Sequence, residues 1–228
     1  MPMQPPSAFA GTLARRVPLW IKLPYTAFLC VLVPIYWRDY GPTNFLYFCD
    51  VALFITLVAV WRESPFLSSM ASVGILLPQA FWVADFAACA VGLRITGLTA
   101  YMFEAHRPLF TRLLSLFHGW LPFLLAYLVW RLGYDRRAFL AWTVLALALV
   151  VVCYAWLPPP PAPPDNPNLP VNINYVYGLS DSGKQTLMPD LAWLALLLVG
   201  LPVLIYWPTH VALKKLCRER PMGQQASA

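Results

Sequence analysis

The sequence predicts an all-α fold: a polytopic membrane protein whose six transmembrane helices form a bundle, with a Pro/Asn-rich outer loop between helices 5 and 6. Of the 228 residues, 60% are hydrophobic and only 11% are charged, whereas soluble domains carry about 25% charged residues. The apolar residues come in blocks of about 20, the length of a helix that crosses the hydrocarbon core. The longest polar stretch, about 30 residues, is too short to bury a core of its own. We therefore expect residues 1–228 to form a single integral membrane domain.

Charged residues and prolines delimit six apolar segments. They are residues 19–37, 44–61, 66–92, 113–131, 138–157 and 191–209. Residues 158–189 form the outer loop, which opens with a polyproline run that favours an extended conformation over a helix. The first segment also has features of a signal peptide. No small-x-small cleavage site follows it, so we interpret it as a transmembrane helix.

The basic residues set the orientation. With both ends of the chain on one side, that side carries eleven of the sixteen Lys and Arg residues, and such an excess marks the cytoplasmic side. We expect a multi-pass protein of the bacterial cell inner membrane with both termini in the cytoplasm and residues 210–228 as a basic cytoplasmic tail. Because the basic residues lie at the ends of apolar segments, the net charge of +6 indicates contact with membrane lipid and no nucleic-acid partner.

The sequence carries no motif for a cofactor or a metal. There is no Walker A, GxGxxG, HExxH or GxSxG pattern. Four of the five cysteines lie within apolar segments, and none belongs to a CxxC pair. We therefore expect no cofactor, no metal site and no disulfide framework.

Two ionisable side chains inside apolar segments, Asp50 and His118, are the strongest candidates for a functional site. A charge at membrane depth costs several kcal/mol unless it is paired. Asp50 follows Thr43 by seven residues and His118 follows Thr111 by seven, so each should lie about 10 Å below the outer surface. We expect the carboxylate to hold the imidazole in one tautomer and leave its other nitrogen as a base.

Each of these residues ends a polar stripe, and two facing stripes would form a cleft open to the outside. Residues three and four apart share a helix face, which gives the stripes Thr43–Tyr47–Asp50 and Thr111–Ser115–His118. The base could activate water or a side chain of the site. The candidate nucleophiles are Thr43, Tyr47, Cys49 and Ser115.

Groups from two other segments are candidates for binding a substrate in the same cleft. Asp85 and Gln79 lie in the third apolar segment, with Asp85 expected near the outer rim. In the outer loop, Asn172, Asn174 and Tyr175 are spaced for turns. The segment 172–180 is either a lid over the cleft or an ordered hairpin.

Two fragments resemble a known family. FLYFCD (residues 45–50), followed by an apolar segment, and HGWLPFLL (residues 118–125) are similar to motifs of the androgen-induced-protein family of six-span membrane hydrolases. The resemblance implies hydrolysis of lipid esters by an intramembrane threonine–histidine pair, with His118 and Asp50 as the matching residues. Tyr47 stands where that family has its threonine, and Thr43, one turn earlier, would be the substitute. The chain as a whole also resembles uncharacterised bacterial proteins described only as membrane-associated.

These observations leave three functional hypotheses. The first is a lipid-directed hydrolase or acyl-transfer enzyme with an intramembrane Asp–His site that acts on lipid or a hydrophobic small molecule. The second is a non-enzymatic membrane protein that binds a small molecule, lipid or protein partner through the same cleft. The third is a structural subunit of a complex, in which the Asp50–His118 pair only links two helices at roughly 0.6–2 kcal/mol.

Overall fold

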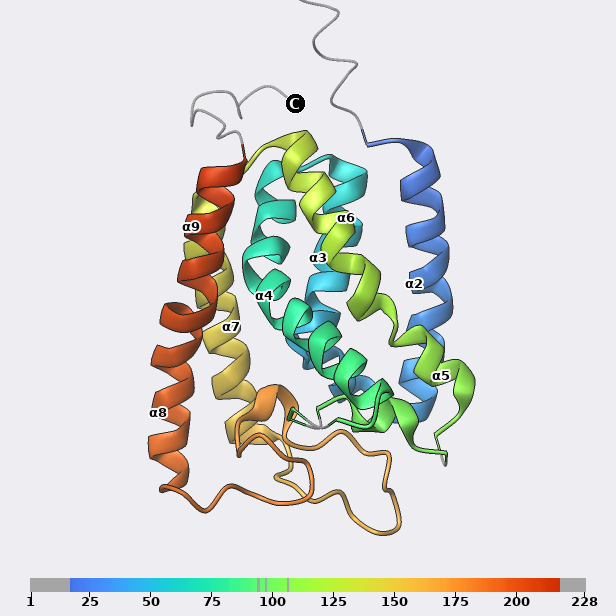
Figure 1. Ribbon diagram of the computed structural model, residues 1–228, viewed down its shortest axis with the longest axis vertical. Helices are drawn as coiled ribbons and strands as arrows, with labels where there is room; N and C mark the ends of the chain where they lie inside the picture. Colours follow the sequence, from blue (N-terminus) through green and yellow to red (C-terminus); the bar gives the residue numbers. More distant parts are fainter. Residues whose placement is uncertain (1–16, 94, 97, 106, 218–228) are drawn as a thin grey trace, which may run out of the picture.

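The computed structural model describes residues 17–93, 95–96, 98–105 and 107–217. All regular elements of these residues are helical (Figure 1), and five helices are long and apolar enough to cross a membrane. They are Leu19–Tyr40, Pro65–Ala90, Leu109–Leu132, Arg137–Trp156 and Asp190–Leu216. The all-helical prediction is confirmed, and the apolar helices fit a membrane protein. Of the basic tail, residues 218–228 lie outside the described residues.

Most helices follow one another with short connections; the exceptions are the α4–α5 connector, which contains η2, and the long loop before α8. In chain order the elements are α2 (Leu19–Tyr40), η1 (Pro42–Leu46), α3 (Phe48–Arg62), α4 (Pro65–Ala90), η2 (Ala100–Phe103), α5 (Leu109–Leu114), α6 (Phe117–Leu132), α7 (Arg137–Trp156), η3 (Ile173–Tyr175), α8 (Asp190–Gly200), the π-helical η4 (Leu201–Tyr206) and α9 (Trp207–Leu216). Helix α3 has 15 residues and rises about 22 Å, which is less than the hydrocarbon thickness of about 30 Å.

Local chemistry explains where α2, α3 and α4 end or begin. Gly41, with φ 80°, ends α2, and Glu63 takes the left-handed conformation that ends α3. The Ser64 hydroxyl then accepts a hydrogen bond from the Leu67 amide at 3.3 Å and caps α4, whose first residue is Pro65. Because proline lacks an amide hydrogen, it is well suited to the first turn of a helix.

The helices stand side by side and the chain has two distinct ends (Figure 1). One end, which we call the tail end, holds Val17, the α3–α4 turn, the α6–α7 turn and Cys217. The opposite end, which we call the loop end, holds η1, the start of α3, the end of α4 and the 158–189 loop. Helix α4 packs against α3, α6 and α7.

Helices α4 and α7 approach closely at a glycine. The Trp142 side chain is fully buried, and its indole lies directly against Gly74 of α4, where a Cβ atom would overlap the ring. Phe48 and Tyr206 contact the same indole edge-on, with ring centroids 6.2 and 6.3 Å away. One side chain of α7 therefore contacts α3, α4 and η4.

Polar contacts fasten the tail end. The Lys22 ammonium of α2 pairs with the Glu63 carboxylate of the α3–α4 turn at 2.6 Å, and both side chains are largely shielded from solvent. Tyr134, in the α6–α7 turn, hydrogen-bonds the Nδ1 atom of His210 in α9 at 2.6 Å. These contacts join helices that are distant in sequence.

Replacing Gly74 by Ala should destabilise the protein by about 1–3 kcal/mol, because the added methyl group would force the Trp142 ring out of its site. The measurement is thermal unfolding of the detergent-solubilised protein. Gly119→Ala is the control: its added methyl group meets no atom within 4 Å, and alanine is favoured over glycine in a helix by about 1 kcal/mol. Equal stability of wild type and Gly74→Ala would contradict the packing described.

Candidate functional site

Asp50 lies in the first turn of α3 and is almost completely buried, with 3% of its surface exposed. The Asn44 side-chain amide donates a hydrogen bond to its Oδ2 atom at 3.0 Å. Its Oδ1 atom has no hydrogen-bond partner among the described residues. A carboxylate at this position is favoured by the partial positive charge of the helix N-terminus, but one of its oxygens has lost water without a replacement.

His118 is the second residue of α6, and its ring is stacked between two aromatic side chains. The ring centroids of Trp82 and Phe117 lie 4.8 and 4.0 Å from that of the imidazole. Its Nδ1 atom is 2.7 Å from the Ser115 carbonyl oxygen. Because a carbonyl can only accept, Nδ1 carries the proton, and Nε2 is left with a free lone pair.

The hydrogen bond expected between Asp50 and His118 is absent among the described residues, so that geometric prediction is wrong. The polar stripe before His118 faces α2. The Thr111 hydroxyl donates to Asp39 at 2.9 Å, and the hydroxyls of Ser115 and Tyr36 are 2.8 Å apart. Thr111 and Ser115 therefore bond residues of α2, not a group on α3.

The stripe Thr43–Tyr47–Asp50 also does not form, because the chain is not a continuous α-helix there. Thr43 lies in the 3₁₀-helix η1, and Tyr47 is extended, with φ −59° and ψ 139°. The Tyr47 amide bonds the Asn44 carbonyl three residues earlier, so the spacing of an α-helix does not apply. No hydrogen bond joins Thr43, Tyr47 or the Ser115 hydroxyl to His118 in the part of the chain that the structure describes.

Gln79 of α4 is 2% exposed, and neither its amide oxygen nor its amide nitrogen has a partner among the described residues. Helices α3 and α4 pack as an antiparallel pair joined at Glu63 and Ser64. Asp50 lies twelve residues before the end of α3 and Gln79 fourteen after the start of α4, so the two are level to within about 3 Å. Two incompletely bonded polar side chains thus lie at one depth on neighbouring helices.

We call the polar residues near this depth the loop-end polar cluster; all but the half-buried His118 are buried. Its members are Tyr36, Asn44, Asp50, Gln79, Ser115 and His118. The Tyr36 hydroxyl of α2 lies 2.8 Å from the Ser115 hydroxyl. The sequence analysis did not predict Tyr36 or Asn44 as site residues. The position of Asn44, an amide six residues before Asp50 at the edge of an apolar segment, could have indicated it as a partner for the carboxylate; the structure shows that it is buried.

Asp85 is used to hold the connector after α4. Its carboxylate accepts four hydrogen bonds, two each from the backbone amides and hydroxyls of Thr96 and Thr99, at 2.7–2.9 Å. These bonds fill the acceptor capacity of an ionised carboxylate. Asp85 therefore has a structural role, because neither carboxylate oxygen is left free to bind a substrate.

The outer loop folds inward at residues 171–178, which we call the plug. Asn174 accepts a hydrogen bond from the Phe48 amide at 3.0 Å and donates to the Leu46 carbonyl at 2.9 Å, so it caps the start of α3. Asn172 accepts from the Tyr177 amide at 2.8 Å and donates to the Gly178 carbonyl at 2.9 Å. The segment is thus an ordered, buried cap, with a 3₁₀ turn where a hairpin was one alternative.

Tyr175 lies at the centre of the plug with an unusual backbone. Its φ angle is 60°, as are those of its neighbours Asn172 and Asn174 within ten degrees, and such values are uncommon for residues other than glycine. The Trp193 indole of α8 donates to its carbonyl at 2.9 Å and holds the turn. Burial, and next the negative charge of Asp181, raise the pKa of Tyr175, so its hydroxyl stays protonated.

Asp50, with 3% of its surface exposed, is closed off from solvent. Two surface hollows lie elsewhere: one of about 590 Å³ on α9, and one of about 340 Å³ between the 179–187 segment and Trp193. In the plug, the Asn174 side chain bonds the amide of Phe48, two residues before Asp50. Access to the cluster from the loop end therefore requires the plug to move.

The arrangement offers acceptors and donors for a ligand but no assembled catalytic set. No group of three or more His, Cys, Asp or Glu side chains that could hold a metal ion occurs within the described ranges. His118 has the tautomer of a base, yet no described nucleophile is bonded to it. Comparison with known proteins finds no matching family model, no similar curated protein and no similar solved structure.

Removing the Asn174 side chain should loosen the plug and expose Cys49, which directly follows Phe48, the residue whose amide donates to Asn174. In a protein whose other cysteines are replaced, Asn174→Gly keeps the backbone conformation accessible but removes two hydrogen bonds of about 1 kcal/mol each. We expect the rate of Cys49 labelling by a membrane-impermeant maleimide to rise about ten-fold.

Asn166→Gly, at an exposed asparagine of the same loop, is the matched control and should leave the rate unchanged. An unchanged rate in Asn174→Gly as well would show that the plug does not guard this end of α3.

Proposed function

We propose that this chain is a six-span protein of the bacterial inner membrane that binds a small polar molecule or a lipid headgroup in the loop-end polar cluster. The described ends, Val17 and Cys217, lie at the same end of the bundle (Figure 1), which supports an even number of crossings. Elements η1 and α3 together cover Pro42–Arg62 and rise about 30 Å. With the five longer helices they make six crossings.

The charges of the two ends support an orientation with the tail end in the cytoplasm. Among the described residues, the acidic side chains of the tail end are Glu63 and Asp135, and its basic ones are Lys22, Arg62, Arg131, Arg136, Arg137, Lys214 and Lys215. The loop end is richer in acidic side chains: Asp39, Glu104, Asp165, Asp181 and Asp190 accompany Arg38, Arg107, Arg112 and Lys184. Basic excess marks the cytoplasmic side, so the plug faces outward.

The observation that carries the binding proposal is the set of unpartnered atoms at one depth. Asp50 Oδ1 and both polar atoms of the Gln79 side chain are buried without a hydrogen bond among the described residues. A buried polar atom without a partner costs about 1–3 kcal/mol, and native proteins leave few such atoms unbonded. A ligand that forms hydrogen bonds with these atoms would offset that cost in free energy.

The free atoms define the ligand chemistry. Asp50 Oδ1 needs an N–H or O–H donor, and Gln79 offers one acceptor and one donor group. The aromatic rings of Tyr36 and Trp82 lie at the same site, through Ser115 and His118 respectively, and would pack against an apolar or cationic part. A small molecule or headgroup with amine or hydroxyl groups satisfies these requirements.

We expect Gln79→Leu to raise the melting temperature of the ligand-free protein in detergent, because it removes a buried amide that has no partner. The same substitution, alone or with Asp50→Asn, should remove small-molecule or lipid adducts that co-purify with wild type in native mass spectrometry. If Gln79 served only to pack the helices, its replacement would not both raise the melting temperature and remove the bound adducts.

The control is Ser72→Ala, a buried polar residue on α4 whose hydroxyl bonds the Ser68 carbonyl at 2.7 Å. It should keep the adducts. The binding proposal fails if Gln79→Leu with Asp50→Asn retains every adduct of wild type, or if Gln79→Leu lowers the melting temperature as a lost internal contact would.

One observation favours hydrolysis of lipid esters as a second candidate. The Ser115 carbonyl fixes the His118 ring and leaves Nε2 unprotonated, as a general base requires. The resemblance of residues 45–50 and 118–125 to the androgen-induced-protein family supports the same activity. Movement of the plug would have to bring Thr43, Tyr47, Ser115 or water within reach of Nε2.

A fluorophosphonate probe applied to membranes tests the covalent form of this activity. Wild type should label, and His118→Ala should lose at least nine-tenths of the label, since a positioned base contributes about 10²–10⁴ in rate. His118→Ala also removes the ring that stacks on Trp82 and Phe117, so the thermal stability of the variant is measured alongside its labelling. Equal labelling of both proteins, or none of either, would exclude a covalent hydrolase.

A further inference from the structure

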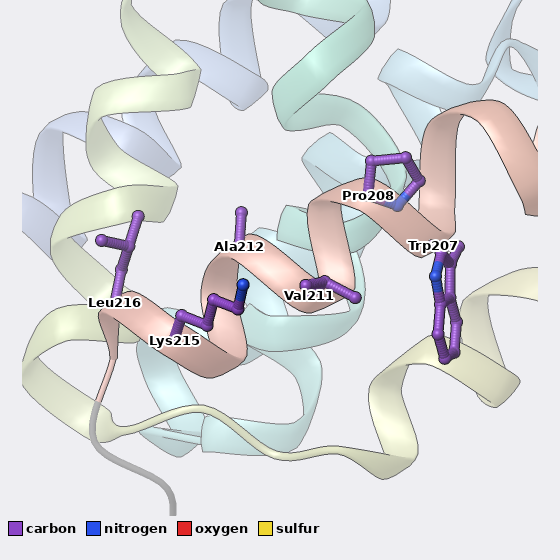
Figure 2. A pocket seen from close by; sticks show the side chains of 6 residues that line it. All are labelled: Trp207, Pro208, Val211, Ala212, Lys215 and Leu216. Atoms are coloured by element: carbon purple, nitrogen blue, oxygen red, sulfur yellow. The ribbon is translucent and has the colours of Figure 1, made fainter.

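A groove on α9 lies at the tail end, far from the loop-end polar cluster. Figure 2 shows the six side chains that line it, from Trp207 to Leu216. They form two rows of residues four apart, Trp207–Val211–Lys215 and Pro208–Ala212–Leu216, and rows with this spacing make the ridges and grooves of a helix surface. The groove has a volume of about 590 Å³ and is shallow and widely open.

Five of the six lining side chains are apolar, and the sixth is a lysine at the end nearest the membrane surface. Ala212 has the smallest side chain of the six, and the Trp207 ring contacts Phe139 of α7 edge-on, with centroids 5.7 Å apart. Trp207 and Lys215 are eight residues apart, about 12 Å along the helix. The groove therefore runs from a fixed indole within the bilayer to a cation at its surface.

The positive charge at the end of the groove has no acidic partner in the part of the chain that the structure describes. Lys214 and Lys215 are exposed and make no ion pair there. The described acidic residues of the tail end are engaged elsewhere, Glu63 by Lys22 and Asp135 by Arg137. An anion from outside the chain is the complement that these lysines lack.

We propose that this groove binds an anionic phospholipid of the adjacent leaflet, with one acyl chain along Pro208 and Ala212 and the phosphate at Lys214 and Lys215. A lipid fits both features, because its chain is apolar and its headgroup supplies the negative charge. A second copy of this chain would bring the same lysines face to face in a symmetric pair, and their repulsion disfavours that occupant. The inference needs only that α9 lies in a membrane, and it is independent of the ligand of the loop-end polar cluster.

The test uses the whole protein in vesicles of dioleoyl-phosphatidylcholine that contain a fixed fraction of a brominated-chain lipid, either phosphatidylglycerol or phosphatidylcholine. Bromine quenches tryptophan at short range, and the difference between wild type and Trp207→Phe isolates the signal of Trp207. We expect brominated phosphatidylglycerol to quench Trp207 at a several-fold lower mole fraction than brominated phosphatidylcholine does. Lys215→Gln should reduce this preference about five-fold, the effect of one surface lysine.

Two further variants separate a built site from general attraction to a charged surface. Arg62→Gln removes one exposed positive charge at the same end of the bundle and should keep the preference. Ala212→Leu keeps both lysines but fills the groove, and it should reduce the preference as much as Lys215→Gln does. The proposal is overturned if both brominated lipids quench Trp207 of wild type equally, if Arg62→Gln acts like Lys215→Gln, or if Ala212→Leu leaves the preference intact.

Discussion

The close approach of α4 and α7, made by the Trp142 indole against Gly74, is the contact on which the arrangement of the other helices depends. The same ring contacts Phe48 at the start of α3 and Tyr206 in η4. In a membrane, lipid tails are as apolar as side chains, so helix association relies on close packing at small residues. The Phe48 contact ties the start of α3 to this interlock, while the turn at Glu63 and Ser64 sets the shared depth of Asp50 and Gln79.

The loop end is shaped by the need to satisfy polar groups away from water. Asp85 is fully bonded by Thr96 and Thr99, and Asn174 caps α3. Among the described residues of this end, Asp50, Gln79 and Arg112 keep buried polar atoms without a hydrogen-bond partner. Departures from full hydrogen bonding in an otherwise satisfied region are expected where a protein binds something.

The two ends of the bundle have different chemistry, and each suits a different partner. The loop end buries its polar groups under an ordered plug, so a ligand there must be small and must wait for the plug to open. The tail end presents exposed lysines beside an apolar groove on α9, which is open to lipid at all times. The polar ligand proposed for the loop end and the lipid proposed for the tail end would therefore bind to different surfaces.

The sequence by itself determined the helical class, the apolar segments, the asymmetry of charge and the burial of Asp50, because hydropathy and charge are properties of each segment alone. It did not determine which side chains meet. The break at Tyr47 removed the α-helical spacing that placed Thr43 above Asp50, and α2 supplied Tyr36 and Asp39 as partners for the stripe before His118. Only the tertiary structure decided these pairings and folded residues 171–178 onto α3, because they depend on the rotation and neighbours of each helix, which periodicity within one segment does not encode.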